Sequence, residues 1–262
     1  MSTPLAFITG ASSGIGLALA EQYARRGWRL ALVARRGELV QAWADEAGLG
    51  PDRVRVYTAD VADAASIEAA GRACIEGFGL PDLVVANAGI SVGMDTRERQ
   101  DLEVMRDTLA VNVVGVAATF HPFVQAMAAR GRGTLVAVAS VAAVRGLPGH
   151  GAYCASKAAV VAYCESLRSE CRPAGVRVLC LLPGFVATPL TARNPYPMPF
   201  LLSAQAFAER AVRAIDAAAA GGASRRVIPW QMAVVARVLP LLPDALFDRL
   251  FARRGRKPRR SD

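Results

Sequence analysis

Two residues near the middle of the chain, Tyr153 and Lys157, stand four positions apart in the stretch GAYCASKAAV. On a helix this spacing puts both side chains on one face, one turn apart. A free tyrosine has a pKa of about 10 and is a poor acid–base at neutral pH, but a nearby ammonium group stabilises the phenolate and lowers that pKa. A phenol tuned in this way can donate a proton to a carbonyl group that receives a hydride.

The use of lysine at position 157 supports this interpretation. The chain contains 29 arginines but only 2 lysines, and the second lysine, Lys257, lies in a basic C-terminal tail. Because a solvated surface or an ordinary ion pair would accept arginine, we infer that position 157 requires a compact ammonium group and not a planar guanidinium group. The alternative is an incidental pair on a helix surface, since tyrosine and lysine often occur at this spacing by chance.

A glycine-rich loop, TGASSGIG at residues 9–16, stands between a short apolar run and a helical pattern. Gly10 allows a tight turn, and Gly14 and Gly16 allow a pyrophosphate and the helix to approach closely. The N-terminus of the helix would present free N–H groups to the anion. The loop therefore predicts a dinucleotide site, with an ordinary turn before a helix as the alternative.

The second predicted strand ends in ALVARR, where a protein that binds NAD usually has an acidic residue, about 20 residues beyond the glycine loop. That residue holds the ribose 2′-hydroxyl. Arg35 and Arg36 stand here instead, and arginine suits a 2′-phosphate. We therefore expect NADP(H) to be preferred over NAD(H). The alternative is two solvated arginines at the end of a strand.

The chain alternates between apolar runs typical of strands and segments with helical spacing. We expect strands at residues 5–10, 28–36, 53–61, 81–89, 133–140 and 176–184. We expect helices at residues 11–27, 64–79, 98–131 and 152–175 and one through Trp43, with a kink or an end near Pro122. This order predicts an α/β fold, a Rossmann-type doubly wound parallel sheet that binds ligands at the carboxyl ends of its strands.

Residues 1–228 are expected to form a single domain of this kind, with a proline-rich lid at about 189–205. Residues 229–262 are expected to form a C-terminal helical extension: two short apolar helices, with Pro229 and Pro243 in their first turns, and then the basic tail. The longest uncharged run, at residues 108–129, is interpreted as a buried helix and not as a membrane span, because it contains several polar residues and a proline.

Composition narrows the range of partners. The net charge is +9, and the last ten residues carry five of these charges. The tail is interpreted either as a solvated terminus or as a peripheral contact with anionic membrane lipid, and it has no interleaved aromatic residue that would indicate nucleic acid. The N-terminus shows no signal-peptide pattern, and the five cysteines form no CxxC pair. Reduced core thiols, a cytoplasmic location and no metal are therefore expected.

Six motifs taken together resemble the short-chain dehydrogenase/reductase (SDR) family over about residues 5–188. In the family's order they are TGASSGIG, NAG at 87–89, LAVNVVG at 109–115, LVAVAS at 135–140, YCASK at 153–157 and LLPGFVATP at 181–189. Ser140 also lies 13 residues before Tyr153, which agrees with the family's spacing. The resemblance implies an oxidoreductase that transfers a hydride between the nicotinamide of NADP(H) and a carbonyl or alcohol carbon.

The resemblance also implies a role for each matching residue. Tyr153 would be the proton donor or acceptor, and Lys157 would lower its pKa and bind the nicotinamide ribose. Ser140 would hold the substrate carbonyl oxygen, and Asn112 would hold a water that links Lys157 to solvent. The residues expected to bind the cofactor are Gly10, Ser12, Ser13, Gly14, Ile15, Gly16, Arg35, Arg36, Asp60, Val61, Asn87, Ala88, Gly89, Tyr153, Lys157, Pro183, Gly184, Val186 and Thr188.

Two positions depart from the family pattern. Ala86 stands where the family often has asparagine, which is expected to loosen a strand contact without abolishing binding. Ser13 stands where many NADP-dependent members carry a basic residue. Arg35 and Arg36 would then have to provide the preference for NADP(H).

The substrate side is less well defined by the sequence. The resemblance places His150 where family members line the substrate pocket, so it could contact a substrate, but a plain loop histidine is the preferred interpretation. A rather apolar substrate is expected from the composition of the lid, namely Pro195, Tyr196, Pro197, Met198 and Phe200. Two alternatives to the proposed enzyme are a non-catalytic nucleotide-binding scaffold and a ketoreductase that acts on acyl-carrier-linked substrates.

The resemblance further suggests a homodimer or homotetramer built on the helices that hold Asn112 and Tyr153. The C-terminal apolar helices could close the pocket, extend a dimer interface or lie on a membrane surface, and the first two are preferred.

Overall fold

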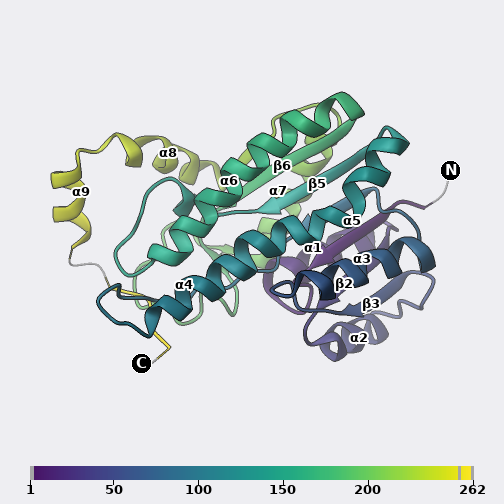
Figure 1. The fold of residues 1–262 in the computed structure, drawn as a ribbon, viewed down its shortest axis with the longest axis horizontal. Helices are drawn as coiled ribbons and strands as arrows, with labels where there is room; N and C mark the ends of the chain where they lie inside the picture. The colour runs from purple at the N-terminus through teal and green to yellow at the C-terminus, as the bar shows by residue number, and fades with distance from the viewer. Residues whose placement is uncertain (1–2, 253–254, 261–262) are drawn as a thin grey trace.

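The computed structural model describes residues 3–252 and 255–260, and the ribbon is shown in Figure 1. The strands are β1 (Leu5–Thr9), β2 (Arg29–Ala34), β3 (Val54–Thr58), β4 (Leu83–Ala86), β5 (Gly133–Val138), β6 (Val176–Pro183), β7 (Val186–Ala187), β8 (Leu202–Ser203) and β9 (Arg225–Ile228). The α-helices are α1 (Gly14–Arg25), α2 (Gly37–Glu46), α3 (Ala64–Gly77), α4 (Asp101–Leu109), α5 (Gly115–Arg130), α6 (Gly151–Cys171), α7 (Ala204–Ala219), α8 (Trp230–Val238) and α9 (Asp244–Phe251).

Seven strands form one parallel sheet in the order β3-β2-β1-β4-β5-β6-β9. Helices α3, α5 and α6 cover one face, where Phe120, Phe123 and Val160 are fully buried, and α1, α2 and α7 cover the other, where Leu19 and Phe207 are fully buried. Both faces are apolar, which explains why the central strands read as continuous hydrophobic runs. The predicted doubly wound, Rossmann-type parallel sheet in a single domain is confirmed.

The sequence analysis missed the last strand, β9, and the helix before it, α7. Strand β9 lies at the edge of the sheet and pairs only with β6. It has four residues, and two of them, Arg225 and Arg226, are exposed. An edge strand this short and polar lacks the apolar run by which the inner strands were identified.

The long helix is continuous from Asp101 to Arg130, and its irregular turn is not at Pro122 as predicted. A π-helical turn spans Ala110–Val114 between α4 and α5. Pro122 lies inside α5, where Gly71 of α3 leaves room for its ring. The helix ends at Gly131, which has a φ of 74°.

By length and composition, this helix is the one among the described residues that could cross a membrane. Its α5 part packs against the sheet instead, with Phe120, Phe123 and Met127 fully buried in the core. The interpretation of the uncharged run as a core helix therefore agrees with the structure.

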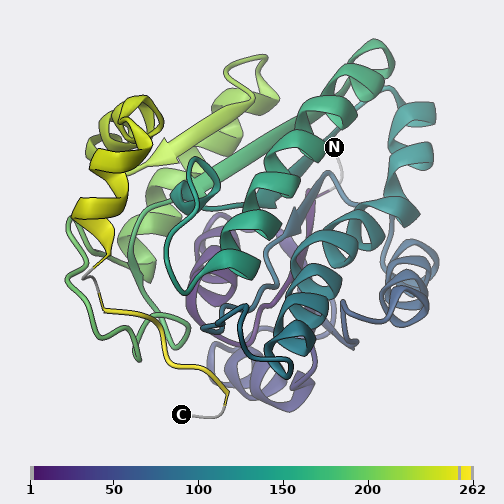
Figure 2. The ribbon, with the colours of Figure 1, turned by 60° about the vertical axis from the view of Figure 1, so that its left-hand side comes forward.

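The C-terminal extension forms the two expected helices, and Pro229 and Pro243 stand at their N-caps, directly before the first turns. Arg145, from the loop after β5, holds this pair of helices in place. It donates to the carbonyls of Leu239 and Leu242 at 3.0 and 2.6 Å and stacks its guanidinium over the Phe247 ring at 4.1 Å. In Figure 2 the chain then returns, in yellow, beside the loop that precedes α4.

Candidate active site

A cavity of ≈ 270 Å³ lies at the carboxyl ends of the strands, and its wall is built from the segments that follow β1 to β6. This is the edge at which a doubly wound sheet binds ligands. Of the catalytic and cofactor-binding residues expected from the sequence, all but Gly16 and Asn112 lie on the wall. The wall also contains Ile90, Leu190 and Thr191, which the sequence analysis missed and which directly follow the matched motifs.

The glycine loop has the geometry that the sequence predicts for a pyrophosphate site. Gly10 has a φ of 68°, and a Cβ added there would lie 2.8 Å from Cα of Ala88. A side chain at Gly16 would collide with the carbonyl of Gly10, so Gly16 allows α1 to pack onto the loop. No side chain caps the N-terminus of α1, where Ser13 is the N-cap residue. The backbone N–H groups there fit an anionic group of a dinucleotide.

The ends of β1 and β4 are tied together behind the glycine loop by Thr9 and Asn87. Asn87 Nδ2 donates to the carbonyls of Thr9 and Gly10 at 3.0 and 3.3 Å, and the backbone N–H of Asn87 donates to Thr9 Oγ1 at 3.1 Å. Ala86 is buried and in register with Ala137 of β5, so the departure from the family's asparagine leaves the strand ladder intact. Asn87 therefore has a positioning role in addition to its place on the wall.

Two exposed arginines lie where the adenosine end of a dinucleotide would be. Arg35 and Arg36 are on the cavity wall at the end of β2, and no acidic residue occupies that position. Arg35 is 3.7 Å from a carboxylate oxygen of Asp60, with 68% and 42% of the two side chains exposed. An ion pair this exposed contributes little, so Arg35 can turn to a phosphate without a large loss.

Tyr153 and Ser140 both lie on the cavity wall. Ser140 ends the β5 segment and also accepts from the backbone N–H of Ala142 at 3.1 Å, which fixes its hydroxyl. Burial raises the pKa of Tyr153 to about 12, although the Ser140 side chain acts in the opposite direction. The phenol therefore holds its proton at neutral pH.

Lys157 lies one turn from Tyr153 on α6, as predicted, but its ammonium group forms its hydrogen bond with the end of β5 and not with the Tyr153 hydroxyl. Nζ donates to the carbonyl of Val138 at 2.8 Å and lies 5.7 Å from the centroid of the Tyr153 ring. Burial lowers the pKa of Lys157 to about 8. The expected net lowering of the Tyr153 pKa is not found, because burial disfavours the phenolate and outweighs the groups that favour it.

Asn112 lies in the π-helical turn and is fully buried. Its Oδ1 accepts from the backbone N–H of Ile90 at 2.8 Å, and its Nδ2 donates to the Ile90 carbonyl at 2.9 Å and to Ser156 Oγ at 3.0 Å. The side chain thus joins α4–α5 to the segment after β4 and to α6. The water relay assigned to Asn112 stays a prediction.

The lid follows β7, and its proline-rich part does not line the cavity. None of the five lid residues that suggested an apolar substrate is on the wall. Tyr196 instead contacts His150, whose Nε2 lies 3.0 Å from the tyrosine hydroxyl and whose Nδ1 lies 3.1 Å from the Pro148 carbonyl. His150 is buried and away from the wall, which agrees with its interpretation as a loop histidine.

All five cysteines are free and buried, as expected for core thiols. Within residues 3–252 and 255–260, no three histidine, cysteine or acidic side chains gather in a way that could hold a metal ion. The polar side chains of the cavity wall are serine and threonine hydroxyls, the Tyr153 phenol, the Lys157 ammonium group, the Asn87 amide, the Asp60 carboxylate and the guanidinium groups of Arg35 and Arg36.

A parallel sheet in this strand order, with a glycine loop after β1 and a ligand cavity at its carboxyl edge, defines a dinucleotide-binding protein of the Rossmann type. A family model described as short chain dehydrogenase matches residues 4–197. The chain therefore belongs to the short-chain dehydrogenase/reductase family of oxidoreductases.

Proteins of similar sequence include an oxidoreductase of unassigned substrate and two proteins named for different activities. An uncharacterized oxidoreductase of Myxococcus xanthus is 44% identical over 95% of this chain and 96% of its own length. D-threitol dehydrogenase of Mycolicibacterium smegmatis is 39% identical over 71% of both chains. Granaticin polyketide synthase putative ketoacyl reductase 1 of Streptomyces violaceoruber is 38% identical over 72% of this chain and 70% of its own.

Solved structures of similar fold hold nicotinamide cofactors of both kinds. An alcohol dehydrogenase from Thermococcus sibiricus, complexed with 5-hydroxy-NADP, has a TM-score of 0.78 and 29% identity, covering 87% of this chain and 96% of that one. A short chain dehydrogenase/reductase from Burkholderia phymatum, in complex with NAD, has a TM-score of 0.79 and 27% identity, covering 90% and 92%.

Proposed function

We propose that this chain is an NADP(H)-dependent oxidoreductase that interconverts a carbonyl group and an alcohol, with Tyr153 as the proton donor and acceptor. The observation that carries the proposal is that Tyr153, Ser140 and Lys157 lie on the wall of the same cavity that the glycine loop and Arg35 line. A bound nicotinamide would supply or accept the hydride. Everything else in the reaction is assigned to side chains of the wall.

Ser140 and Tyr153 would both bind the reacting oxygen. Ser140 is held by Ala142, so its hydroxyl can steady the oxygen as negative charge develops on it. Tyr153 keeps its proton at neutral pH because its pKa is about 12, and it can give that proton to the oxygen as the carbonyl is reduced. With a raised pKa, Tyr153 is present at neutral pH as the phenol and not as the phenolate, which is the form that donates a proton during reduction.

Lys157 would act on the cofactor side and electrostatically on Tyr153. An ammonium group has three N–H donors, and Val138 accepts one of them. The other two suit ribose hydroxyls. Its positive charge, close to the phenol ring, would offset negative charge that forms on Tyr153 after proton transfer.

The pH profile of carbonyl reduction should show the lysine. Because the pKa of Lys157 is lowered to about 8 and that of Tyr153 is raised to about 12, Lys157 and not Tyr153 loses its proton between pH 8 and 10. We expect kcat/KM to be flat below about pH 7.5 and to fall about tenfold per pH unit above about pH 8.5. Steady-state rates from pH 6 to 10 measure this, and a flat profile up to pH 10 would contradict it. Lys257 also has a pKa of about 8, so the falling limb must persist in a Lys257→Met variant.

Cofactor preference should depend on Arg35 and Arg36. Replacing both by serine is expected to weaken NADPH binding about tenfold or more and to change NADH binding less than about threefold, because only the 2′-phosphate loses charged partners. Fluorescence titration with each cofactor measures this. An Arg72→Ser variant, on the surface of α3, is the matched control. Tighter binding of NADH than NADPH by the unaltered protein would overturn the proposed preference.

The substrate class is best approached through the named relatives. A panel with a polyol, an aliphatic ketone, an aromatic aldehyde and a β-ketoacyl thioester covers both the proposed function and the acyl-carrier-linked alternative. Turnover of the thioester and of no other compound in the panel would favour the ketoreductase that acts on acyl-carrier-linked substrates. Nucleotide binding without turnover on any member would favour the non-catalytic scaffold.

Assembly and location stay predictions. A homodimer or homotetramer built on α4–α5 and α6, and a cytoplasmic location, are what the family resemblance suggests. Sedimentation of the purified chain would measure its assembly. Membrane contact through the tail is not favoured, because the arginines among the described tail residues pair with aspartates of the protein itself.

A further inference from the structure

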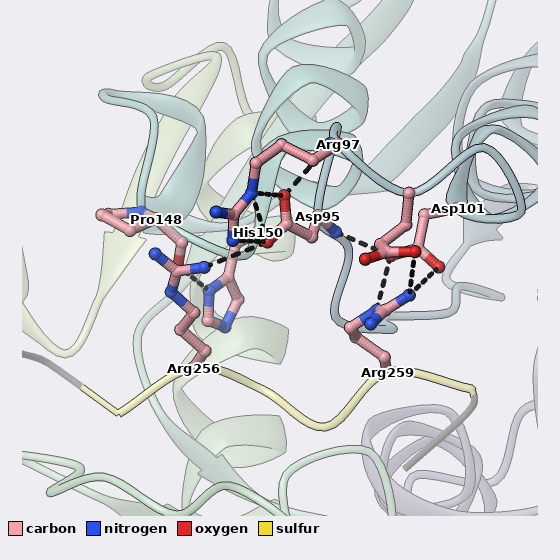
Figure 3. A network of polar contacts seen from close by, with 8 residues as sticks. Asp95, Arg97, Asp101, Pro148, His150, Arg256 and Arg259 are labelled. Atoms are coloured by element: carbon pink, nitrogen blue, oxygen red, sulfur yellow. Dashed lines mark hydrogen bonds and ion pairs between the residues drawn. The ribbon is translucent and has the colours of Figure 1, made fainter.

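The basic tail folds back onto the body of the protein. Three of its arginines reach acidic residues on or just before α4: Arg256 to Asp95 at 3.4 Å, Arg259 to Asp101 at 2.8 Å and Arg260 to Asp107 at 2.7 Å. Figure 3 shows the first two contacts. We call residues 255–260 the strap. The remaining tail residues, 253–254 and 261–262, lie outside the described residues.

The Arg259–Asp101 pair anchors the strap. Asp101 is only 2% exposed and Arg259 is 23% exposed, whereas Arg256 and Arg260 are about half exposed. Asp101 also accepts from the backbone N–H of Asp95 at 2.7 Å, which fixes the carboxylate. Exposed pairs contribute little, so the partly buried pair carries most of the electrostatic contribution.

The body provides a shaped seat for the strap at two glycines. The backbone N–H of Gly93 donates to the Pro258 carbonyl at 3.0 Å, and a side chain at Gly93 would collide with the Lys257 carbonyl. A Cβ at Gly149 would lie 3.1 Å from the Arg256 side chain. Gly149 is four residues before Tyr153, and Gly93 follows the segment that lines the cavity after β4.

Lys257 connects the strap to the cavity wall itself. Its Nζ donates to the carbonyl of Leu190 at 2.9 Å, and Leu190 lines the cavity. Lys257 is only 8% exposed, and among the described residues no carboxylate pairs with it. It is also one of the two lysines in a chain with 29 arginines, and the other is Lys157. A compact ammonium group fits this buried contact with a single carbonyl.

The strap therefore joins three segments around the substrate side of the cavity: the segment after β4, the loop before α6 and the lid. The lid is held at a second point by the hydrogen bond between Tyr196 and His150. We propose that Lys257 is a positioning residue, which fixes the lid at Leu190 so that the protein's own C-terminal strap completes the substrate site. This proposal rests on the proposed function for the identity of the site.

The test uses full-length variants that release the strap from opposite sides. Lys257→Met removes the hydrogen bond to Leu190. Gly93→Ala displaces the Lys257 carbonyl from its seat while the amino-acid sequence of the strap stays the same. The matched control is Gly146→Ala, in the nearby loop before α6, where an added Cβ meets no atom within 4 Å. The double variant Gly93→Ala/Lys257→Met shows whether both changes act through one element.

The first readout is amide hydrogen exchange of the lid, without any ligand. The amides of Thr191, Ala192 and Asn194 are hydrogen-bonded within the lid and report its opening. We expect each single variant to speed their exchange about tenfold, as for loss of one hydrogen bond from a charged donor. The double variant should resemble either single variant, and Gly146→Ala should resemble the unaltered protein.

The second readout is the split between KM and kcat for whichever carbonyl compound of the panel is reduced. Both single variants should raise KM about tenfold and change kcat and the NADPH dissociation constant less than about threefold. Unchanged lid exchange in both variants would overturn the proposal, and so would additive effects in the double variant. Hydrogen exchange of the lid is measured without turnover. It therefore tests the strap even if the protein proves not to have the proposed function.

Discussion

Replacing Tyr153 by phenylalanine is expected to reduce turnover about 10³-fold or more and to leave NADPH affinity within about twofold. The substitution removes one oxygen from a partly buried side chain and keeps the ring that lines the cavity. The proton that the pKa of about 12 keeps on the phenol would no longer be available to the reacting oxygen. Ser140 would still hold that oxygen, so weak residual turnover is expected.

The matched control is Tyr163→Phe, ten residues further along the same helix. Tyr163 packs against the core and is absent from the cavity wall. Single-turnover mixing with NADPH and a panel substrate, together with fluorescence titration of NADPH, separates the proton step from cofactor binding. Turnover by Tyr153→Phe within about tenfold of the unaltered protein would exclude Tyr153 as the proton donor.

The positions of the site residues could be predicted because strand ends determine them. The site residues Gly10, Arg35, Asn87 and Gly184 are far apart in the chain, but each directly follows a parallel strand, and Ser140 lies two residues beyond the end of β5. Once the apolar runs are recognised as one parallel sheet, these residues must meet at its carboxyl edge. The helical spacing of Tyr153 and Lys157 is equally local, and the structure places both on the wall.

The electrostatics of the pair could not be read from the sequence. Spacing shows that Lys157 and Tyr153 share a helix face, but the direction of a pKa shift depends on burial by segments distant in the chain. Burial raises the pKa of the Tyr153 phenol. The carbonyl of Val138, at the end of β5, accepts a hydrogen bond from the ammonium group of Lys157. The inference that position 157 needs a lysine rests on the scarcity of lysine in the sequence. The inference that this lysine acidifies the phenol depends on burial, which the sequence does not show.

The strap shows a second limit of the same kind. A run of arginines near a terminus looks like a solvated or lipid-binding tail, because its partners are not adjacent to it. Asp95, Asp101 and Asp107 lie about 150 residues earlier, and nothing in their spacing identifies them as partners of the tail. Only the return of the chain past α9 brings the two sets together, as Figure 2 shows.

The second large effect is expected from Lys157→Arg, a change that keeps the charge and alters its shape. Lys157 is 4% exposed, and its Nζ lies 3.5 Å from where a Cβ on Gly89 would be. A guanidinium group is wider and planar and would have to displace the segment after β4 or leave the Val138 carbonyl. We expect turnover to fall about 10²-fold or more, with weaker NADPH binding because the ribose loses its donors.

A companion variant, Lys157→Met, separates charge from size. It fits the space but removes the ammonium group, so it should also lose turnover, and the falling limb of the pH profile above pH 8 should disappear with it. Arg168→Lys, exposed on the same helix, is the reverse substitution at a site without these constraints and should behave like the unaltered protein. Full turnover by Lys157→Arg would mean that any cation suffices at this position. The scarcity of lysine in a chain rich in arginine would then carry no information about the site.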